Sequence, residues 1–437
     1  MNSSKFEEFL NKVTSKVKSK EAHSMIKKEL TNHLQELSQS FQKREHSKEE
    51  AEDKAIREMG NPFTIGENLN RLHKPRIDWL LITLFIIISG IGFLPLIGGV
   101  PNIPVPSTYY IERRAILYTL AVIVIVSFLF FDYRKLRKWW TFFYCSGLIL
   151  LIYTNLFGYT VMGGKRWVAF FGGTIDVTIT ILFFYLAWAG LFTRIQKFAG
   201  WKKQLLLFIL VWIPVLYYIT LPDIMFCIIY LCCVLVMFAF SQAPKIYVIT
   251  FTIANVLVGL IVASTLFYTR GEYFITRLLG FINPEEDSKG AGYIYIVVKN
   301  ALSEAGWFGN GLNKGPTHVR FPEAHTDFAF PYLVYSLGWA FGIFLCILLV
   351  VFILRISSNA FKTKDLYGRL LVIGGTALFT IPTFWNILMG FGLVPIMGVS
   401  LPLISYGGSL LLFYAAIIGL ILNVYRRKDF VEPSIVE

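Results

Sequence analysis

Long runs of apolar residues, separated by short polar segments, dominate the chain from residue 78 onward. The runs cover residues 78–98, 114–131, 139–158, 176–193, 204–221, 225–241, 247–268, 329–354, 370–390 and 407–425. Several of them reach the roughly 20 residues that a helix needs to cross the hydrocarbon core of a bilayer. The pattern therefore predicts an all-α polytopic membrane protein with about ten transmembrane helices.

The first 60 residues show a different periodicity, in which single apolar residues recur at helical spacing. Three such segments predict three short amphipathic helices, and the pairs Ser4 with Glu7 and Ser47 with Glu50 are typical of helix-capping boxes. Gly60 indicates the end of the third helix. We expect a soluble three-helix bundle at residues 1–60 and a linker at 61–77. The bundle resembles the helical prefix domain of some Firmicute membrane proteins, which implies regulation or docking of a cytoplasmic partner.

Composition and charge support the membrane interpretation. The 437 residues are 55% hydrophobic and 16% charged, whereas soluble domains carry about 25% charged residues. The net charge of +13 does not indicate nucleic-acid binding, because the basic residues cluster in short loops between the apolar runs. Basic loops at 132–140, 193–203, 355–364 and 425–428 fall on one side, which the positive-inside rule makes cytoplasmic. Both termini, including a tail at 428–437, are then cytoplasmic, and residues 269–328 form a large external loop.

Two segments that are predicted to be external carry basic residues, contrary to the positive-inside rule. One contains Lys165 and Arg166 followed by Trp167, and the large loop contains several basic residues, among them Lys314 and Arg320. Cations on the outer side indicate an anionic partner there. The alternative is that arginine and tryptophan anchor the chain at the level of the lipid headgroups.

Several motifs in the membrane part carry a family resemblance. They are "NPEED" with "GAGY" (283–293), "GNGL" (309–312), "PEAHTDF" (322–328) and "LPLISYGGS" (401–409). Over residues 78–427 the chain resembles the shape, elongation, division and sporulation family, which includes RodA, FtsW and SpoVE. The resemblance implies a peptidoglycan glycosyltransferase that polymerises lipid II on the outer face of the cytoplasmic membrane. It also implies a class B penicillin-binding protein as partner, and a role in cell shape, division or sporulation.

The resemblance places the essential acidic residue of the family at Asp327. Glycan polymerisation needs a base that takes a proton from a sugar hydroxyl, and a positioned carboxylate serves this purpose. From the residues alone, Asp327 is also a good N-cap for the helix that follows, so we expect it both to start that helix and to act as the base in an inverting transfer. His325 is predicted to orient Asp327 by a hydrogen bond, with packing as the alternative. Glu323 is a supporting charge or a solvated loop residue.

The departing lipid diphosphate needs positive charge. Candidates are Lys165, Arg166, Lys314 and Arg320, or a divalent cation such as Mg²⁺ or Mn²⁺. None of the five cysteines shows metal-ligand spacing with histidine, and no protein metal site is predicted. Ser405 and Tyr406 could offer hydroxyls to the substrate, with a simple helix break in "LPLISYGGS" as the alternative.

Three departures from the family pattern make several polar positions apolar. The chain reads "DVTI" (176–179) where the family usually has Gln-Pro-Ser-Glu, Val297 and Val298 in place of Gln-Ser, and "LPDIM" (221–225) in place of Gln-Pro-Asp-Leu-Gly. These changes predict a diverged member. Two other functions remain open: a flippase for lipid-linked precursors, which the scarcity of ionisable residues at mid-depth disfavours, and a non-catalytic scaffold for a cell-wall synthase.

Overall fold

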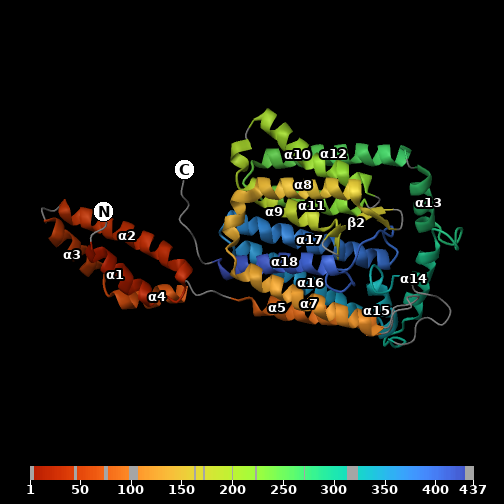
Figure 1. Ribbon diagram of the computed structural model, residues 1–437, viewed down its shortest axis with the longest axis horizontal. Coiled ribbons are helices and arrows are strands. Elements are labelled where there is room, and N and C mark those ends of the chain that lie inside the picture. Colours follow the sequence, from red (N-terminus) through yellow and green to blue (C-terminus); the bar gives the residue numbers. More distant parts are fainter. Residues whose placement is uncertain are drawn as a thin grey trace. The chain divides into compact units, whose positions relative to one another are not determined.

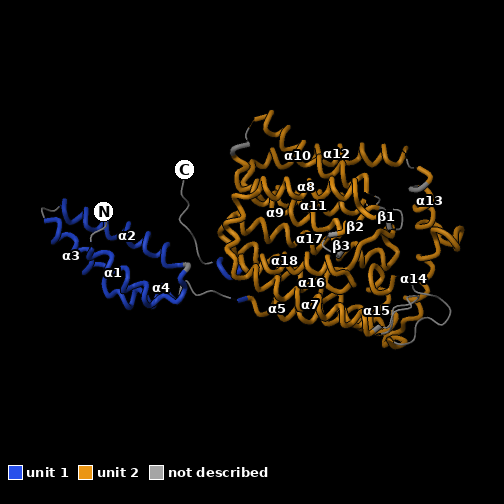
Figure 2. The backbone as a smooth tube through the Cα atoms, viewed as in Figure 1, with its two compact units in different colours: residues 1–77, 425–437 blue, residues 78–424 orange. Residues whose placement is uncertain are grey.

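The computed structural model describes residues 4–43, 47–72, 77–97, 107–161, 164–170, 173–198, 200–221, 224–269, 271–312 and 323–428. The chain divides into two compact units, one of residues 1–77 with 425–437 and one of residues 78–424 (Figure 2). Lys314 and Arg320 lie outside the described residues, as do positions 429–437 of the predicted tail.

Within residues 4–43 and 47–72, which the structure describes, the first unit contains four helices rather than the predicted three. They are α1 (Ser4–Ser15), α2 (Lys20–Gln42), α3 (Lys48–Met59) and α4 (Pro62–Leu72). Gly60 ends α3, but Pro62 begins a new helix, because proline is well tolerated in the first turn, where its missing N–H has no helical partner. The segment predicted as a linker therefore begins with α4. The apolar stripes meet in one small core, and Ser47 and Glu50 form the predicted capping box.

The second unit is a bundle of apolar helices. Eight described helical stretches are long and apolar enough to cross a membrane, and two shorter apolar helices, α9 and α11, cover the remaining predicted runs. The elements are α5 (Trp79–Ile91), α6 (Leu94–Ile97), α7 (Ser107–Phe130), η1 (Tyr133–Trp139), α8 (Trp140–Phe157), α9 (Ile179–Phe192), η2 (Ile195–Phe198), α10 (Trp201–Thr220), α11 (Met225–Ala239), α12 (Lys245–Thr269), α13 (Gly271–Ile282), α14 (Tyr293–Glu304), α15 (Ala329–Leu337), α16 (Trp339–Lys362), α17 (Leu366–Gly390) and α18 (Gly408–Arg426). The predicted polytopic helical architecture is confirmed.

The helices of this unit run side by side, and α13 and α14 cross one end of the bundle (Figure 1). Helices α17 and α18 are mostly buried inside the bundle, whereas only a small share of α7 and α12 is buried. Exposed apolar faces of this kind suit a lipid environment, because the surrounding hydrocarbon is itself apolar. The end crossed by α13 and α14 also holds α15 and β2, and the candidate site is built there.

The predicted run at residues 329–354 is not one helix. It breaks at Gly338, whose φ of 88° ends α15, and α16 starts at the next residue. A Cβ on Gly338 would lie 2.2 Å from the carbonyl oxygen of Trp307. The "GNGL" segment docks at this break, where the Gly311 amide donates to the Ser336 carbonyl at 2.8 Å. Only glycine permits both this backbone conformation and this close approach.

A small antiparallel sheet interrupts the predicted all-α pattern. Strands β1 (Tyr159–Val161), β2 (Gly164–Phe170) and β3 (Gly173–Asp176) pair in the order β1-β2-β3. The register sets Trp167 opposite Asp176. Residues 176–178 therefore lie before the next span, and α9 begins only at Ile179.

A buried carboxylate joins the first span to α16. Asp78 caps α5 by accepting from the Leu81 amide at 3.2 Å. It also accepts from Arg355 Nε at 3.0 Å, from Arg355 Nη2 at 2.9 Å and from Asn359 Nδ2 at 3.0 Å. Only 1% of Asp78 is exposed, so this bidentate ion pair between Asp78 and Arg355 is largely removed from water.

Candidate functional site

Asp327 lies in a turn directly before α15. The turn spans residues 323–328 and is closed by the Phe328 amide, which donates to the Glu323 carbonyl at 3.2 Å. Glu323 has a positive φ of 50°, and its carboxylate accepts from the Thr326 hydroxyl at 2.6 Å. The N-cap of α15 is Phe328. The prediction that Asp327 starts the helix is therefore wrong by one residue, because the backbone turn places its carboxylate elsewhere.

The Asp327 carboxylate faces the loop between α17 and α18. Ser400 Oγ donates to Asp327 Oδ1 at 2.9 Å. Asn386, fully buried in α17, donates to the Asp327 carbonyl at 2.8 Å and to the Val399 carbonyl at 2.6 Å. Asp327 is partly exposed, so its carboxylate is oriented by the protein and still open to a ligand. Neither Ser400 nor Asn386 was predicted, although Ser400 directly precedes the "LPLISYGGS" motif.

Two of the motifs that carried the family resemblance, "PEAHTDF" and "LPLISYGGS", are bonded to each other. Ser405 Oγ donates to the Thr326 carbonyl at 2.5 Å and accepts from the Leu401 amide at 2.7 Å. The Tyr406 amide donates to the His325 carbonyl at 2.7 Å. The Ser405 hydroxyl thus joins the 323–328 turn to the 399–406 loop. The Tyr406 hydroxyl is buried and has no hydrogen-bond partner among the described residues.

The His325 ring packs between two tyrosines. Its centroid lies 6.1 Å from that of Tyr110 and 6.0 Å from that of Tyr406. In the described part of the chain, His325 Nδ1 is buried without a hydrogen-bond partner. This arrangement matches the packing alternative rather than the predicted bond to Asp327. Burial lowers the pKa of His325, Glu323 raises it and Arg114 lowers it further, with a net decrease.

This lowered pKa predicts an acid-sensitive contribution to stability. The unfolded chain takes up a proton at His325 near pH 6.5, whereas the folded protein keeps the ring neutral to lower pH. The contribution of neutral His325 to the free energy of unfolding is therefore fully present above about pH 6.5 and is lost as the pH drops below it. We expect the thermal midpoint to fall less between pH 7 and pH 5 in His325→Phe than in the wild type. His33→Phe, at an exposed position on α2, is the control, and equal slopes for wild type and His325→Phe would contradict the prediction.

A narrow, mostly apolar pocket connects Ser400 with Arg166. Its walls come from the residues around β3 and from α9, α11, α17 and α18. The lining residues are Arg166, Thr178, Ile181, Met225, Phe226, Ile229, Leu378, Pro382, Gly398, Val399, Ser400, Leu410, Phe413 and Tyr414. Arg166, the predicted cation, and Ser400, which donates a hydrogen bond to Asp327, therefore line the same pocket, although they are far apart in the sequence.

Arg166 is held in place by a buried carboxylate. Its Nε donates to Asp176 Oδ2 at 2.8 Å, and its guanidinium lies over the rings of Trp167 and Phe226 at 5.4 and 5.1 Å. Asp176 is 5% exposed and also accepts from the amide and hydroxyl of Thr178. The departure "DVTI" thus supplies the partner of Arg166. The β2–β3 register explains why residues ten apart meet.

Lys165 points away from this pocket. Its Nζ donates to the carbonyls of Asn155 and Leu156 at 3.0 and 3.4 Å. These carbonyls belong to the last turn of α8, where a cation is favoured by the helix dipole. The structure thus separates the two basic neighbours, with Arg166 at the pocket and Lys165 capping a helix.

Among the described residues, no three His, Cys, Asp or Glu side chains gather closely enough to hold a metal ion. Asp327 and Asp176 each bind protein donors, as described above.

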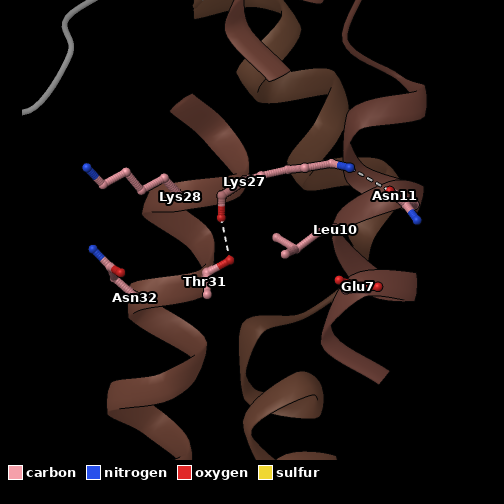
Figure 3. Close-up of a pocket in the computed structure, with 7 residues that line it drawn as sticks. All are labelled: Glu7, Leu10, Asn11, Lys27, Lys28, Thr31 and Asn32. Carbon is pink, nitrogen blue, oxygen red and sulfur yellow. Dashed lines mark hydrogen bonds between the residues drawn. The ribbon is translucent and has the colours of Figure 1, made fainter. Parts of the chain in front are cut away.

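The first unit has a larger, polar groove of about 430 Å³ between α1 and α2 (Figure 3). Its lining residues are Glu7, Leu10, Asn11, Lys27, Lys28, Thr31 and Asn32. Lys27 Nζ donates to Asn11 Oδ1 at 2.7 Å, and the Thr31 hydroxyl donates to the Lys27 carbonyl at 2.6 Å. These groups bind one another rather than forming a nucleophile with an adjacent base.

The second unit defines a class of protein, a multi-pass helical membrane protein. Its candidate site combines the Asp327 carboxylate, in a turn before a helix, with a largely apolar pocket that Ser400 and Arg166 line. The family model FTSW_RODA_SPOVE, described as "Cell cycle protein", matches residues 78–429. The chain belongs to this family, and the predicted membership is confirmed.

Similar proteins carry consistent names. The "Peptidoglycan glycosyltransferase RodA" of Treponema pallidum is 25% identical over 430 residues, covering 80% of this chain and 98% of that protein. The "Peptidoglycan glycosyltransferase MrdB" of Escherichia coli is 27% identical over 330 residues, covering 74% of this chain and 88% of that protein. The "Probable peptidoglycan glycosyltransferase FtsW" of Trichlorobacter lovleyi is 27% identical over 326 residues, covering 72% and 83%.

Two solved structures share the fold. The rod shape determining protein RodA of Thermus thermophilus has a TM-score of 0.59 at 21% identity, covering 80% of this chain and 97% of that chain. A chain from work on "structural coordination of polymerization and crosslinking by a peptidoglycan synthase complex" has a TM-score of 0.66 at 21% identity, covering 80% and 98%.

Proposed function

We propose that the chain is a peptidoglycan glycosyltransferase that polymerises lipid II on the outer face of the cytoplasmic membrane. The observation that carries the proposal is the bond between Ser400 and the Asp327 carboxylate, because Ser400 lines the same pocket as the Arg166 cation. Glycan transfer from a lipid diphosphate needs a base and a positive charge near each other, and Ser400 connects the Asp327 carboxylate to the pocket that Arg166 lines. The names of the relatives agree with this activity.

Each group has one role in the proposed reaction. Asp327 takes the proton of the acceptor 4-hydroxyl. The hydroxyl oxygen attacks the anomeric carbon of the lipid-linked growing chain, forming the new glycosidic bond as the bond to the diphosphate breaks, with inversion. The lipid diphosphate leaves with the bonding electron pair. Arg166, fixed by Asp176, stabilises the negative charge that develops on it.

The surroundings suit a lipid-linked substrate. The pocket walls are largely apolar, and the outer helices α7 and α12 present apolar side chains to their surroundings. An apolar exterior of this kind would let the lipid tail of the substrate remain in the bilayer. The likeness to a chain from a complex that couples polymerization and crosslinking supports a class B penicillin-binding protein as partner.

The test is polymer synthesis by the purified full chain. Labelled lipid II is supplied in detergent, with and without a candidate class B penicillin-binding protein, and the products are separated by size. We expect glycan polymers, in larger amounts with the partner. The assay is run with Mg²⁺, with Mn²⁺ and with a chelator, because the substrate diphosphate can itself bind a divalent cation.

Absence of polymer under every condition that activates a relative would overturn the proposal. Movement of labelled lipid II across vesicle membranes without polymer would then identify a flippase. Stimulation of the partner's own synthesis by a chain that makes no polymer would identify a scaffold.

A further inference from the structure

Arg114 in α7 is a buried cation that the sequence did not single out. It is 3% exposed. Its Nη2 donates to the Ile404 carbonyl at 2.6 Å, to the Leu403 carbonyl at 3.0 Å and to the Tyr118 hydroxyl at 3.0 Å. Arg114 therefore bonds the backbone of a segment 289 and 290 residues further along the chain.

The backbone that Arg114 holds is strained. Leu403 has a φ of 66°, which is unfavourable for a non-glycine residue. Such a conformation persists only where the surroundings fix it. The Leu403 carbonyl accepts from Arg114 and also from the Tyr118 hydroxyl, at 2.8 Å. Two side chains of one helix thus fix this turn.

The strained turn lies between the groups that contact the Asp327 turn. Ser400, before it, donates to the Asp327 carboxylate, and Ser405, after it, donates to the Thr326 carbonyl. The Tyr406 amide donates to the His325 carbonyl. A displacement of Leu403 and Ile404 would therefore move both attachments of Asp327.

The burial of Arg114 is costly for a residue that only packs. Among the described residues, its Nε and Nη1 are buried without hydrogen-bond partners. A buried donor without a hydrogen-bond partner destabilises the folded state, and more so on a charged group. Apolar side chains that replace buried ions are often neutral or stabilising. A costly buried cation beside a reactive turn indicates a role in function.

We propose that Arg114 is a positioning residue for the Asp327 base. It fixes the 401–406 turn through the Leu403 and Ile404 carbonyls, and this turn fixes Asp327 through Ser400 and Ser405. The inference rests on the proposed function, because it assigns Asp327 the role of base.

Two glycines of the first span provide a matched pair of variants. A Cβ at Gly92 would lie 2.1 Å from Arg114 Nη2 and 3.0 Å from the Ile404 carbonyl oxygen, whereas no atom lies within 4 Å of a Cβ at Gly90. Gly92→Ala should therefore push the guanidinium off the carbonyls without changing any charge. Gly90→Ala adds the same methyl group to the same helical segment without a collision.

The experiment compares kcat and KM for lipid II polymerisation. We expect Gly92→Ala and Arg114→Met to lower kcat about 10–100-fold at nearly unchanged KM, since small displacements of a catalytic group have effects of this size. Gly90→Ala should retain the wild-type kcat, and Arg114→Lys should recover part of the loss seen in Arg114→Met. Combining Gly92→Ala with Arg114→Met should add little, because both remove one contact.

A second measurement separates this inference from the proposed function. Hydrogen exchange of the Ile404 and Ser405 amides, which donate to the Leu401 carbonyl, should accelerate in Gly92→Ala but not in Gly90→Ala, while the thermal midpoints stay close. Wild-type kcat in Gly92→Ala, or a change confined to KM, would overturn the positioning role. If the wild type makes no polymer, the proposed function fails. In that case, unchanged hydrogen exchange in Gly92→Ala would also show that Arg114 does not fix the turn through the Leu403 and Ile404 carbonyls.

Discussion

Asp327→Asn should lower the rate of polymer formation from lipid II about 10²–10⁴-fold, the range that a positioned general base contributes. Asparagine has the size of aspartate, and its carbonyl oxygen can still accept the Ser400 hydroxyl that now bonds Asp327. It cannot take a proton from a sugar hydroxyl. The fold should therefore persist while the chemical step fails, which initial rates at saturating lipid II will measure.

Glu304→Gln is a suitable control for this measurement. Glu304 is an exposed carboxylate at the end of α14 in the predicted external loop, and its replacement should leave the rate nearly unchanged. A rate for Asp327→Asn within a few-fold of the wild type would show that the base is another group. Equal loss in both variants would indicate a general effect of charge on the loop.

Asp78→Ala should lower the free energy of unfolding by about 3–5 kcal/mol, the usual cost of removing one partner of a buried ion pair. The variant leaves the Arg355 guanidinium and the Asn359 amide without their carboxylate partner and removes the cap of α5. Thermal unfolding of the purified protein in detergent will show this as a strongly lowered midpoint.

Asp53→Ala removes a carboxylate of the same type from an exposed pair. Asp53 and Lys5 lie 2.8 Å apart, but both side chains are about half exposed, and exposed pairs contribute little to stability. Its midpoint should stay near that of the wild type. A similarly small effect for Asp78→Ala would mean that water or another group replaces the lost carboxylate.

The hydrophobic pattern predicted the spans because a bilayer demands long uninterrupted apolar stretches. It could not reveal the break at Gly338, since "LVYSLGWAFG" (333–342) reads as continuously apolar. That break depends on the approach of the segment around Trp307, a tertiary contact. The same limit hid the β1–β3 sheet, whose short strands resemble the entry to a span. Helix α4 was missed because residues 61–77 were predicted to be a linker, although Pro62 is a suitable first-turn residue of a helix.

The candidate site was only partly accessible from the sequence. Asp327 and Arg166 stand in recognisable segments, but Ser400 and Asn386 meet Asp327 from 73 and 59 residues away. Arg114 meets its carbonyl partners across almost 300 residues. No local pattern encodes such contacts. The pairing of Arg166 with Asp176 is the exception, because an antiparallel hairpin could have been inferred from the glycines between them.

The bond between Asp78 and Arg355 also bears on how the chain is made. The two residues are 277 positions apart. At a synthesis rate of about 5–20 residues per second, roughly 14–55 s pass between their emergence from the ribosome. During that interval the first span has its carboxylate but not its cation. The ion pair can therefore form only after α16 has been synthesised. The first span thus depends on a late part of the chain for the partner of its buried carboxylate.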